Sequence, residues 1–100
     1  MYGIRNNLYE EIINIFRLFD IKKAILFGSR ARGDFKNASD IDIAIEFSVS
    51  NKDNFIKLFT KLEDLNTLYK FDIVDLESLN DDSAFKKEIT KDGIIIYEKN

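Results

Sequence analysis

The stretch that decides the fold is Gly28-Ser29-Arg30-Ala31-Arg32-Gly33, followed after a short gap by Ser39-Asp40-Ile41-Asp42-Ile43-Ala44-Ile45. In the first segment, a glycine and a serine follow an apolar run that ends at Phe27, which is typical of a strand that turns into a helix. In the second segment, isoleucines alternate with aspartates, which is typical of a strand with one buried face. We expect a sharp turn and then a strand that carries two carboxylates on one face.

The composition bounds the class of protein. The chain has 100 residues, of which 45% are hydrophobic and 33% are charged. This balance is typical of a globular domain and not of a disordered chain. A chain of this length corresponds to one domain. We therefore expect residues 1–100 to form a single domain that folds on its own.

The net charge and the missing residue types exclude several functions. A formal charge of -3 argues against binding of long nucleic acids, which requires a basic face. The chain has no cysteine and no histidine, so any acid–base or metal chemistry must use carboxylates. The N-terminal residues show no signal peptide, and no apolar run approaches the length of a membrane span. We expect a cytoplasmic protein that does not associate with a membrane.

Hydrophobic periodicity predicts alternating helices and strands. Apolar residues at helical spacing mark the helices, and short apolar or alternating runs mark the strands. Capping residues are expected within residues 50–53 for the third helix and at Asp81, Asp82 or Ser83 for the last one. The predicted helices span about residues 5–19, 29–32, 53–68 and from the last cap to 90, and the predicted strands span 22–27, 40–47, 71–76 and 94–97.

The glycine-serine turn is a candidate phosphate-binding element. Gly28 allows a ligand to approach the backbone closely, and Ser29 with the following amides forms a helix start that attracts anions. The serine hydroxyl is able to donate to a phosphate oxygen, and Arg30 and Arg32 offer positive charge to a triphosphate. The alternative interpretation is a common strand-to-helix connector without a functional role.

Asp40 and Asp42 are candidate metal ligands. Their period-2 spacing places both carboxylates on the same face of a strand, where they repel each other and raise each other's proton affinity. A divalent cation relieves that repulsion, and Mg²⁺ prefers a few carboxylates together with triphosphate oxygens and water. The alternative interpretation is a solvated acidic face on an edge strand.

The strand predicted over residues 71–76 offers a third carboxylate. Asp72 shares the face of Asp40 and Asp42 if Phe71 points to the helices, whereas Asp75 has the opposite parity. We choose Asp72, although the pattern leaves Asp75 open.

Bringing these groups to one site constrains the topology. The first two strands must be antiparallel neighbours, and the third must run parallel to the second across a helical connection. The predicted fold is α+β, with a mixed sheet of about four strands and helices packed mainly on one face.

The motif of this chain consists of Gly28-Ser29, ten intervening residues and then Asp40-Ile41-Asp42. It resembles the signature of the minimal nucleotidyltransferases of the DNA polymerase beta superfamily. The resemblance extends over essentially the whole chain, including residues 71–76 and 92–97. It implies the nucleotidyltransferase fold, with Gly28, Ser29 and Arg30 on the nucleotide. It further implies two Mg²⁺ ions at Asp40, Asp42 and Asp72, with Asp72 helping to deprotonate the acceptor.

Chains of this size also resemble the antitoxin of HEPN/MNT pairs, in which the nucleotidyltransferase adenylylates a tyrosine of the HEPN ribonuclease toxin. The resemblance implies ATP as substrate and a HEPN-family toxin as partner, with an oligomer formed through that partner. We expect the acceptor to come from a separate molecule, because so short a chain has no room for its own acceptor-binding domain. The alternatives are an antitoxin that masks the toxin without catalysis, and a nucleotidyltransferase subunit that modifies a small molecule such as an aminoglycoside.

Overall fold

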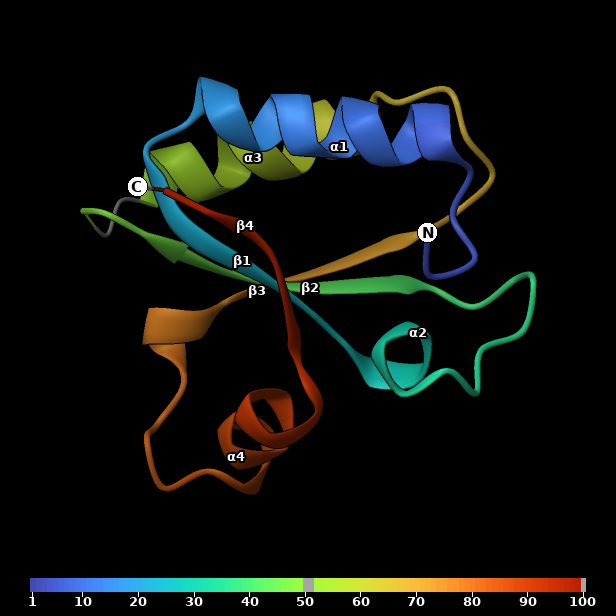
Figure 1. Ribbon diagram of the computed structural model, residues 1–100. Helices are drawn as coiled ribbons and strands as arrows, with labels where there is room; N and C mark the ends of the chain where they lie inside the picture. The colour runs from blue at the N-terminus through green and yellow to red at the C-terminus, as the bar shows by residue number, and fades with distance from the viewer. Residues whose placement is uncertain (50–51, 100) are drawn as a thin grey trace.

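Four strands form one mixed sheet with the order β3-β2-β1-β4 (Figure 1). The computed structural model describes residues 1–49 and 52–99. Strand β1 (Ile21–Phe27) pairs antiparallel with β2 (Ile41–Phe47) and with β4 (Ile94–Glu98), whereas β2 pairs parallel with β3 (Phe71–Asp75). The antiparallel and parallel pairings predicted for the first three strands are confirmed. The helices are α1 (Asn6–Leu18), α2 (Gly28–Arg32), α3 (Lys52–Glu63) and α4 (Ala84–Asp92), with a 3-10 turn at Leu76–Ser78.

Helices α1 and α3 cover one face of the sheet and close the main hydrophobic core (Figure 1). Both helices are amphipathic, because their apolar residues recur at helical spacing and leave the polar residues on the outer side. Alternate residues of β2 meet them, so the predicted burial of one strand face is confirmed. The side chains at the centre of this core include Ile12, Phe16, Ile43, Ile45, Phe47, Leu58 and Leu62.

A second, smaller core lies on the opposite face of the sheet. There Ile89 of α4 packs with Ile25, Phe27, Ala44 and Leu76. The prediction that helices lie mainly on one face holds for the two longest ones, while α4 and the short α2 lie on the other side (Figure 1). Ala44 shares the face of β2 with Asp42, yet it is fully buried because this second cluster covers it.

Helix α3 ends earlier than predicted. It ends at Glu63 and not near residue 68, and Leu68 is fully exposed to solvent. The helical bonding pattern is replaced by a turn, in which the Leu65 amide donates to the Leu62 carbonyl at 3.1 Å, and the Thr67 hydroxyl then accepts from the Tyr69 amide at 3.2 Å. The segment then returns to the sheet, where the Ile41 amide donates to the Lys70 carbonyl at 2.8 Å.

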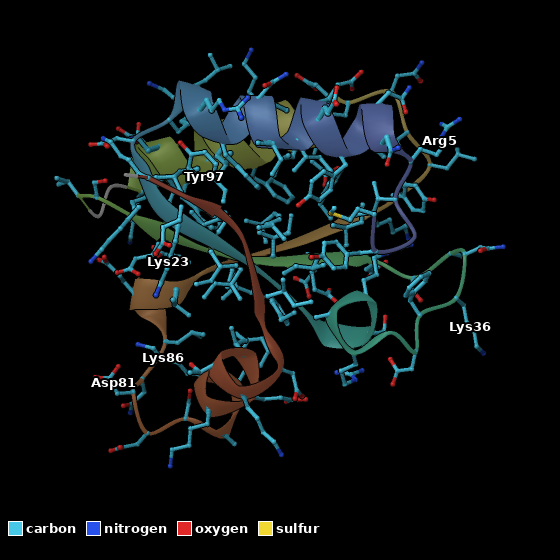
Figure 2. All side chains as sticks on the ribbon, viewed as in Figure 1. Arg5, Lys23, Lys36, Asp81, Lys86 and Tyr97 are labelled. Atoms are coloured by element: carbon cyan, nitrogen blue, oxygen red, sulfur yellow. The ribbon has the colours of Figure 1, made fainter. Side chains whose placement is uncertain are left out.

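Ser83 is the residue that caps α4. Its hydroxyl accepts from the Lys86 amide at 3.1 Å, which selects Ser83 among the three predicted candidates. Lys86 also donates from its ammonium to Asp81 at 2.5 Å, and Figure 2 shows both side chains beside this turn. Of the predicted capping residues of α3, Ser50 and Asn51 lie outside the described residues. Within residues 1–49 and 52–99, no helix has the length and apolar character needed to cross a membrane.

Two leucines near the end of α3 allow a matched test of this core. Leu62 is 0% exposed and Leu68 is 103% exposed. We expect Leu62→Ala to lower the free energy of unfolding by about 2–5 kcal/mol, because it removes buried methyl groups and leaves a cavity. The same change at Leu68 is expected to cost less than about 0.5 kcal/mol. Urea denaturation of both variants measures the difference, and equal losses would contradict the placement of Leu68 outside the core.

Candidate active site

The parallel pairing of β2 with β3 brings two carboxylates side by side. Asp42 and Asp72 are register partners, so both lie at the same level of the sheet and on the same face. Neighbouring strands lie about 4.8 Å apart, and the two carboxyl groups share a hydrogen bond. This is the face opposite α1 and α3. The predicted juxtaposition of Asp42 with Asp72 is therefore present in the structure.

Asp42 is the carboxyl group that this arrangement perturbs most clearly. Its pKa is raised to about 6, first because it is partly buried, then because the charges of Asp72 and Asp40 lie close by. A hydrogen bond that the protonated Asp42 carboxyl donates to Asp72 raises this pKa further, whereas the guanidinium of Arg32 lowers it. Burial and nearby negative charge disfavour the ionised carboxylate and raise its pKa, whereas a nearby positive charge lowers it. Asp40, Asp42 and Asp72 therefore form one electrostatically coupled cluster, which we call the carboxylate cluster.

The glycine-serine turn lies directly against this cluster. Gly28 has a φ of +72°, and a Cβ atom at this position would collide with Oδ2 of Asp42. Only glycine combines this backbone conformation with so close an approach. Helix α2 follows at once and ends at Gly33, whose amide donates to the Ser29 carbonyl at 2.9 Å. The structure thus places Gly28 directly beside Asp42, as predicted, and Ser29 follows it within α2.

Arg30 does not lie where the sequence analysis put it. Its side chain is only 1% exposed, and its guanidinium donates to backbone carbonyl groups of Tyr2, Asn37 and Ser39. It is therefore not free to contact a triphosphate, and the prediction of Arg30 as a nucleotide-binding residue is corrected. Arg32, two residues further along the helix, is exposed, donates to the Asp34 carboxylate at 3.3 Å and acts electrostatically on Asp42. Of the two arginines, Arg32 is the one that faces the carboxylate cluster.

Asp75 has a structural role. Its carboxylate accepts from the Glu77 amide at 3.1 Å, and its carbonyl accepts from the Ser78 hydroxyl at 2.7 Å. These bonds cap the 3-10 turn that follows β3. Of the two aspartates left open by the sequence, Asp72 is the one that lies beside Asp42.

The donor set suits a cation that arrives together with a nucleotide. In the part of the chain that the structure describes, no three acidic side chains already form a metal-binding group. Mg²⁺, however, is usually held by one or two carboxylates together with substrate phosphates and water. The carboxylate cluster supplies the oxygen ligands and a repulsion that a cation would relieve. Among the described residues, the predicted set of Asp40, Asp42 and Asp72 does not form a three-ligand group, and the register pair Asp42 and Asp72 offers the two carboxylates of such a site.

A hollow of about 630 Å³ opens beside Asp40. Among its lining residues are Arg5, Leu68 and Lys70, and Figure 2 shows Arg5 at this end of the molecule. Arg5 and Lys70 come from distant segments, and no local sequence motif marks either of them. The hollow gives a second molecule a route to the edge of the carboxylate cluster.

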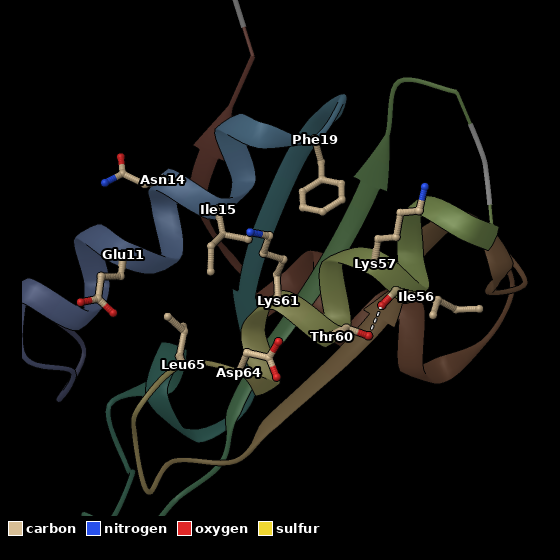
Figure 3. A pocket seen from close by; sticks show the side chains of 10 residues that line it. All are labelled: Glu11, Asn14, Ile15, Phe19, Ile56, Lys57, Thr60, Lys61, Asp64 and Leu65. Atoms are coloured by element: carbon tan, nitrogen blue, oxygen red, sulfur yellow. Dashed lines mark hydrogen bonds between the residues drawn. The ribbon is translucent and has the colours of Figure 1, made fainter.

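A larger hollow of about 740 Å³ lies on the far side of the molecule, between α1 and α3. Figure 3 shows Ile15 and Phe19 on one side and Thr60 and Leu65 on the other, with the Thr60 hydroxyl donating to the Ile56 carbonyl. The sheet separates this hollow from the carboxylate cluster. Size alone therefore does not identify the active site, whereas the carboxyl groups and the turn do.

Comparisons with known proteins agree with this geometry. The family model described as "Polymerase beta, Nucleotidyltransferase" matches residues 10–100. "Putative protein adenylyltransferase MJ0604" of Methanocaldococcus jannaschii is 45% identical over 69 residues, which make up 69% of this chain and 63% of that protein. "Putative protein adenylyltransferase MJ1379" of the same organism is 34% identical over 80 residues, covering 78% of this chain and 79% of that protein. The chain thus spans less than two thirds of the length of MJ0604.

Solved structures give the same assignment of the fold. A crystal structure of a toxin-antitoxin with AMP-PNP superposes with a TM-score of 0.72 at 25% identity, over 91% of this chain and 73% of that chain. A mutant of the toxin-antitoxin MntA-HpeT superposes with a TM-score of 0.71 at 23% identity, over 91% and 73% of the two chains, and shows the fold alone. The family match over residues 10–100 and the two-carboxylate site together show that this chain belongs to the polymerase beta nucleotidyltransferase family.

Proposed function

We propose that this chain transfers AMP from ATP to a tyrosine hydroxyl of a HEPN-family ribonuclease toxin, in a reaction that depends on Mg²⁺, and so acts as an antitoxin. The observation that carries the proposal is the close contact between the Gly28 turn and Asp42, which itself pairs with Asp72. The names of the relatives as protein adenylyltransferases and of the neighbouring structures as toxin-antitoxin complexes support the choice of reaction and partner.

The proposed reaction is an in-line displacement at the α-phosphate. The acceptor oxygen forms a bond to the α-phosphorus, the bond from that phosphorus to the oxygen bridging to the β-phosphate breaks, and pyrophosphate leaves. The proton of the acceptor hydroxyl passes to a carboxylate, for which we propose Asp72. With no histidine in the chain, a carboxylate is the available base.

We assign the binding of phosphates and the binding of metal ions to two different parts of the site. Gly28 and Ser29 would bind the phosphates, with the exposed Arg32 in place of Arg30 as the nearby positive charge. Asp40, Asp42 and Asp72 would hold one or two Mg²⁺ ions, and bound Mg²⁺ neutralises charge on the triphosphate. The raised pKa of Asp42 supports this assignment, because it comes first from partial burial and then from the charges of Asp72 and Asp40.

The acceptor is proposed to belong to a separate molecule that reaches Asp40 through the adjacent hollow. We treat residues 1–100 as one minimal domain without a dedicated acceptor-binding part, supported by the single sheet. The proposal places the reaction in the cytoplasm, because ATP is the donor. Long nucleic acid is not proposed as a substrate, given the net charge of -3.

AMP transfer is tested with ATP labelled at the α-phosphate, Mg²⁺ and a HEPN-family ribonuclease as the acceptor protein. We expect label on the toxin, and we expect Asp42→Asn to lower the rate by about 100-fold or more, since even indirect supports of metal ligands contribute up to that much. Asp75→Asn is the matched control on the neighbouring strand and should retain the rate. Labelling that survives in Asp42→Asn would contradict the proposal.

The same assay separates the alternative functions. If the chain still neutralises the toxin when Asp40 and Asp42 are both changed to alanine, and no label is transferred, then it acts by masking the toxin and not by catalysis. Label that appears on an aminoglycoside and not on the toxin would replace the protein acceptor by a small molecule.

The repulsion within the carboxylate cluster predicts a stability that depends on pH. The folded-state pKa of Asp42 is about 6, and an unfolded aspartate titrates near about 3.9. Between these values the folded state binds more protons, so this group lowers stability as pH rises from about 4 to 6, and the full cost is present at neutral pH. We expect Asp42→Asn to raise the melting temperature by about 5 °C at pH 7.5 without metal, and by much less at pH 4.5.

Differential scanning fluorimetry at the two pH values measures this effect. The exposed Asp82 provides the matched control, because Asp82→Asn removes one negative charge outside the carboxylate cluster. An equal rise in melting temperature for Asp42→Asn at both pH values would contradict the raised pKa of Asp42.

A further inference from the structure

The buried guanidinium of Arg30 donates to three carbonyl groups in two backbone segments. Nη1 donates to the Tyr2 carbonyl at 3.0 Å, and Nη2 donates to the Ser39 carbonyl at 2.9 Å and to the Asn37 carbonyl at 3.4 Å. Tyr2 belongs to the N-terminal turn, whereas Asn37 and Ser39 belong to the loop between α2 and β2. One side chain of α2 thus holds both of these segments.

Two aromatic rings lie against the guanidinium. Its Cζ atom is 5.1 Å from the centroid of Phe35 and 4.8 Å from the centroid of Tyr69. Cations at this distance from a ring are attracted by its negative face. Tyr69 lies in the segment that connects α3 to β3, so Arg30 contacts a third region of the chain. The planar guanidinium uses its edge for carbonyl groups and its faces for rings, which a lysine ammonium is unable to do.

The residues that Arg30 contacts lie close in sequence to the aspartates of the carboxylate cluster. The Ser39 carbonyl belongs to the peptide bond that joins Ser39 to Asp40. Tyr69 precedes Lys70, whose carbonyl accepts from the Ile41 amide at 2.8 Å and aligns the start of β3 with the start of β2. Two residues after Lys70 comes Asp72, the register partner of Asp42. Arg30 therefore contacts both backbone segments on which the acidic residues are mounted.

The N-terminal turn is shaped to approach this guanidinium. Tyr2 and Gly3 both have positive φ angles, of 55° and 75°, and such a conformation is unfavourable for tyrosine. A Cβ atom at Gly3 would collide with the Phe35 ring and lie 2.7 Å from Nη1 of Arg30. Burying the charge of Arg30 also carries a desolvation cost, and in the described structure its Nε atom has no hydrogen-bond partner. The unfavourable backbone conformation of Tyr2 and the burial of the Arg30 charge thus occur at the same place.

We propose that Arg30 is a positioning residue of the nucleotidyl transfer: it fixes Asp40 and the start of β3 relative to the Gly28-Ser29 turn. This proposal rests on the proposed function. Arg30 does not touch the nucleotide, and it acts through the backbone of Ser39 and the ring of Tyr69. A misplacement of reacting groups by about 1 Å costs on the order of 100-fold in rate, so a small shift of these segments has a large effect.

Arg30→Lys and Tyr69→Leu test this proposal, each assayed well below its own melting temperature so that the variant is folded. We expect both to lower kcat for AMP transfer by more than tenfold while KM for ATP changes less than threefold, because the phosphate-binding turn itself is unaltered. We also expect weaker Mn²⁺ binding in the presence of AMP-PNP, measured by electron paramagnetic resonance. Tyr69→Phe keeps the ring and loses only a hydroxyl that donates to Gly3 at 3.4 Å, so it should retain more activity than Tyr69→Leu.

Arg17→Lys is the matched control, because Arg17 is exposed on α1 and donates to the nearby Asn14 side chain at 2.6 Å. Wild-type kcat and wild-type Mn²⁺ affinity in folded Arg30→Lys would overturn the proposal. If Arg30→Lys does not fold, Tyr69→Leu decides, since it leaves the arginine in place. If the wild-type chain transfers no AMP, the proposed function fails, and the Mn²⁺ measurement still shows whether Arg30 positions the carboxylate cluster.

Discussion

Repulsion between carboxylates on neighbouring parallel strands is the constraint on which the rest of the site depends. The register of β2 and β3 places Asp42 opposite Asp72, and partial burial adds to the cost of charging both. A protein tolerates such a pair when the surrounding layers are stable and when a ligand relieves the repulsion. Helices α1 and α3 supply the stable layer on one face of the sheet, and a cation with a triphosphate would relieve the repulsion on the other.

The two arginines of α2 have different roles, although they are only two residues apart. Arg32 faces the carboxylate cluster and lowers the pKa of Asp42, so it is suited to ligand binding. Arg30 faces the opposite way, into a cage of carbonyl groups and aromatic rings. One arginine thus contributes charge to the site, and the other holds the loop on which the site is built. An exchange of arginine for lysine is conservative at neither position, because only a guanidinium offers a planar fork.

Much of the fold and site was predictable, because the alternation in β2 fixes which face is buried. Bringing the Gly28-Ser29 turn to Asp42 requires the antiparallel pairing, bringing Asp72 to Asp42 requires the parallel one, and both are present. The end of α3 was not predictable from periodicity, since Leu68 continues the apolar spacing although it is exposed. The direction of Arg30 was equally hidden, because five helical residues are too few to define a face and its partners come from distant segments.

The most direct test is a ¹³C NMR titration of the Asp42 carboxyl carbon, first without metal and then with Mg²⁺ and AMP-PNP. Without metal, the pKa should be about 6, because burial and the neighbouring acids oppose the charged form. With Mg²⁺ and the nucleotide, it should fall below the ordinary aspartate value of about 3.9. A pKa near the ordinary value in the free protein, unchanged when Mg²⁺ and AMP-PNP are added, would contradict a coupled carboxylate cluster that binds a cation together with its substrate.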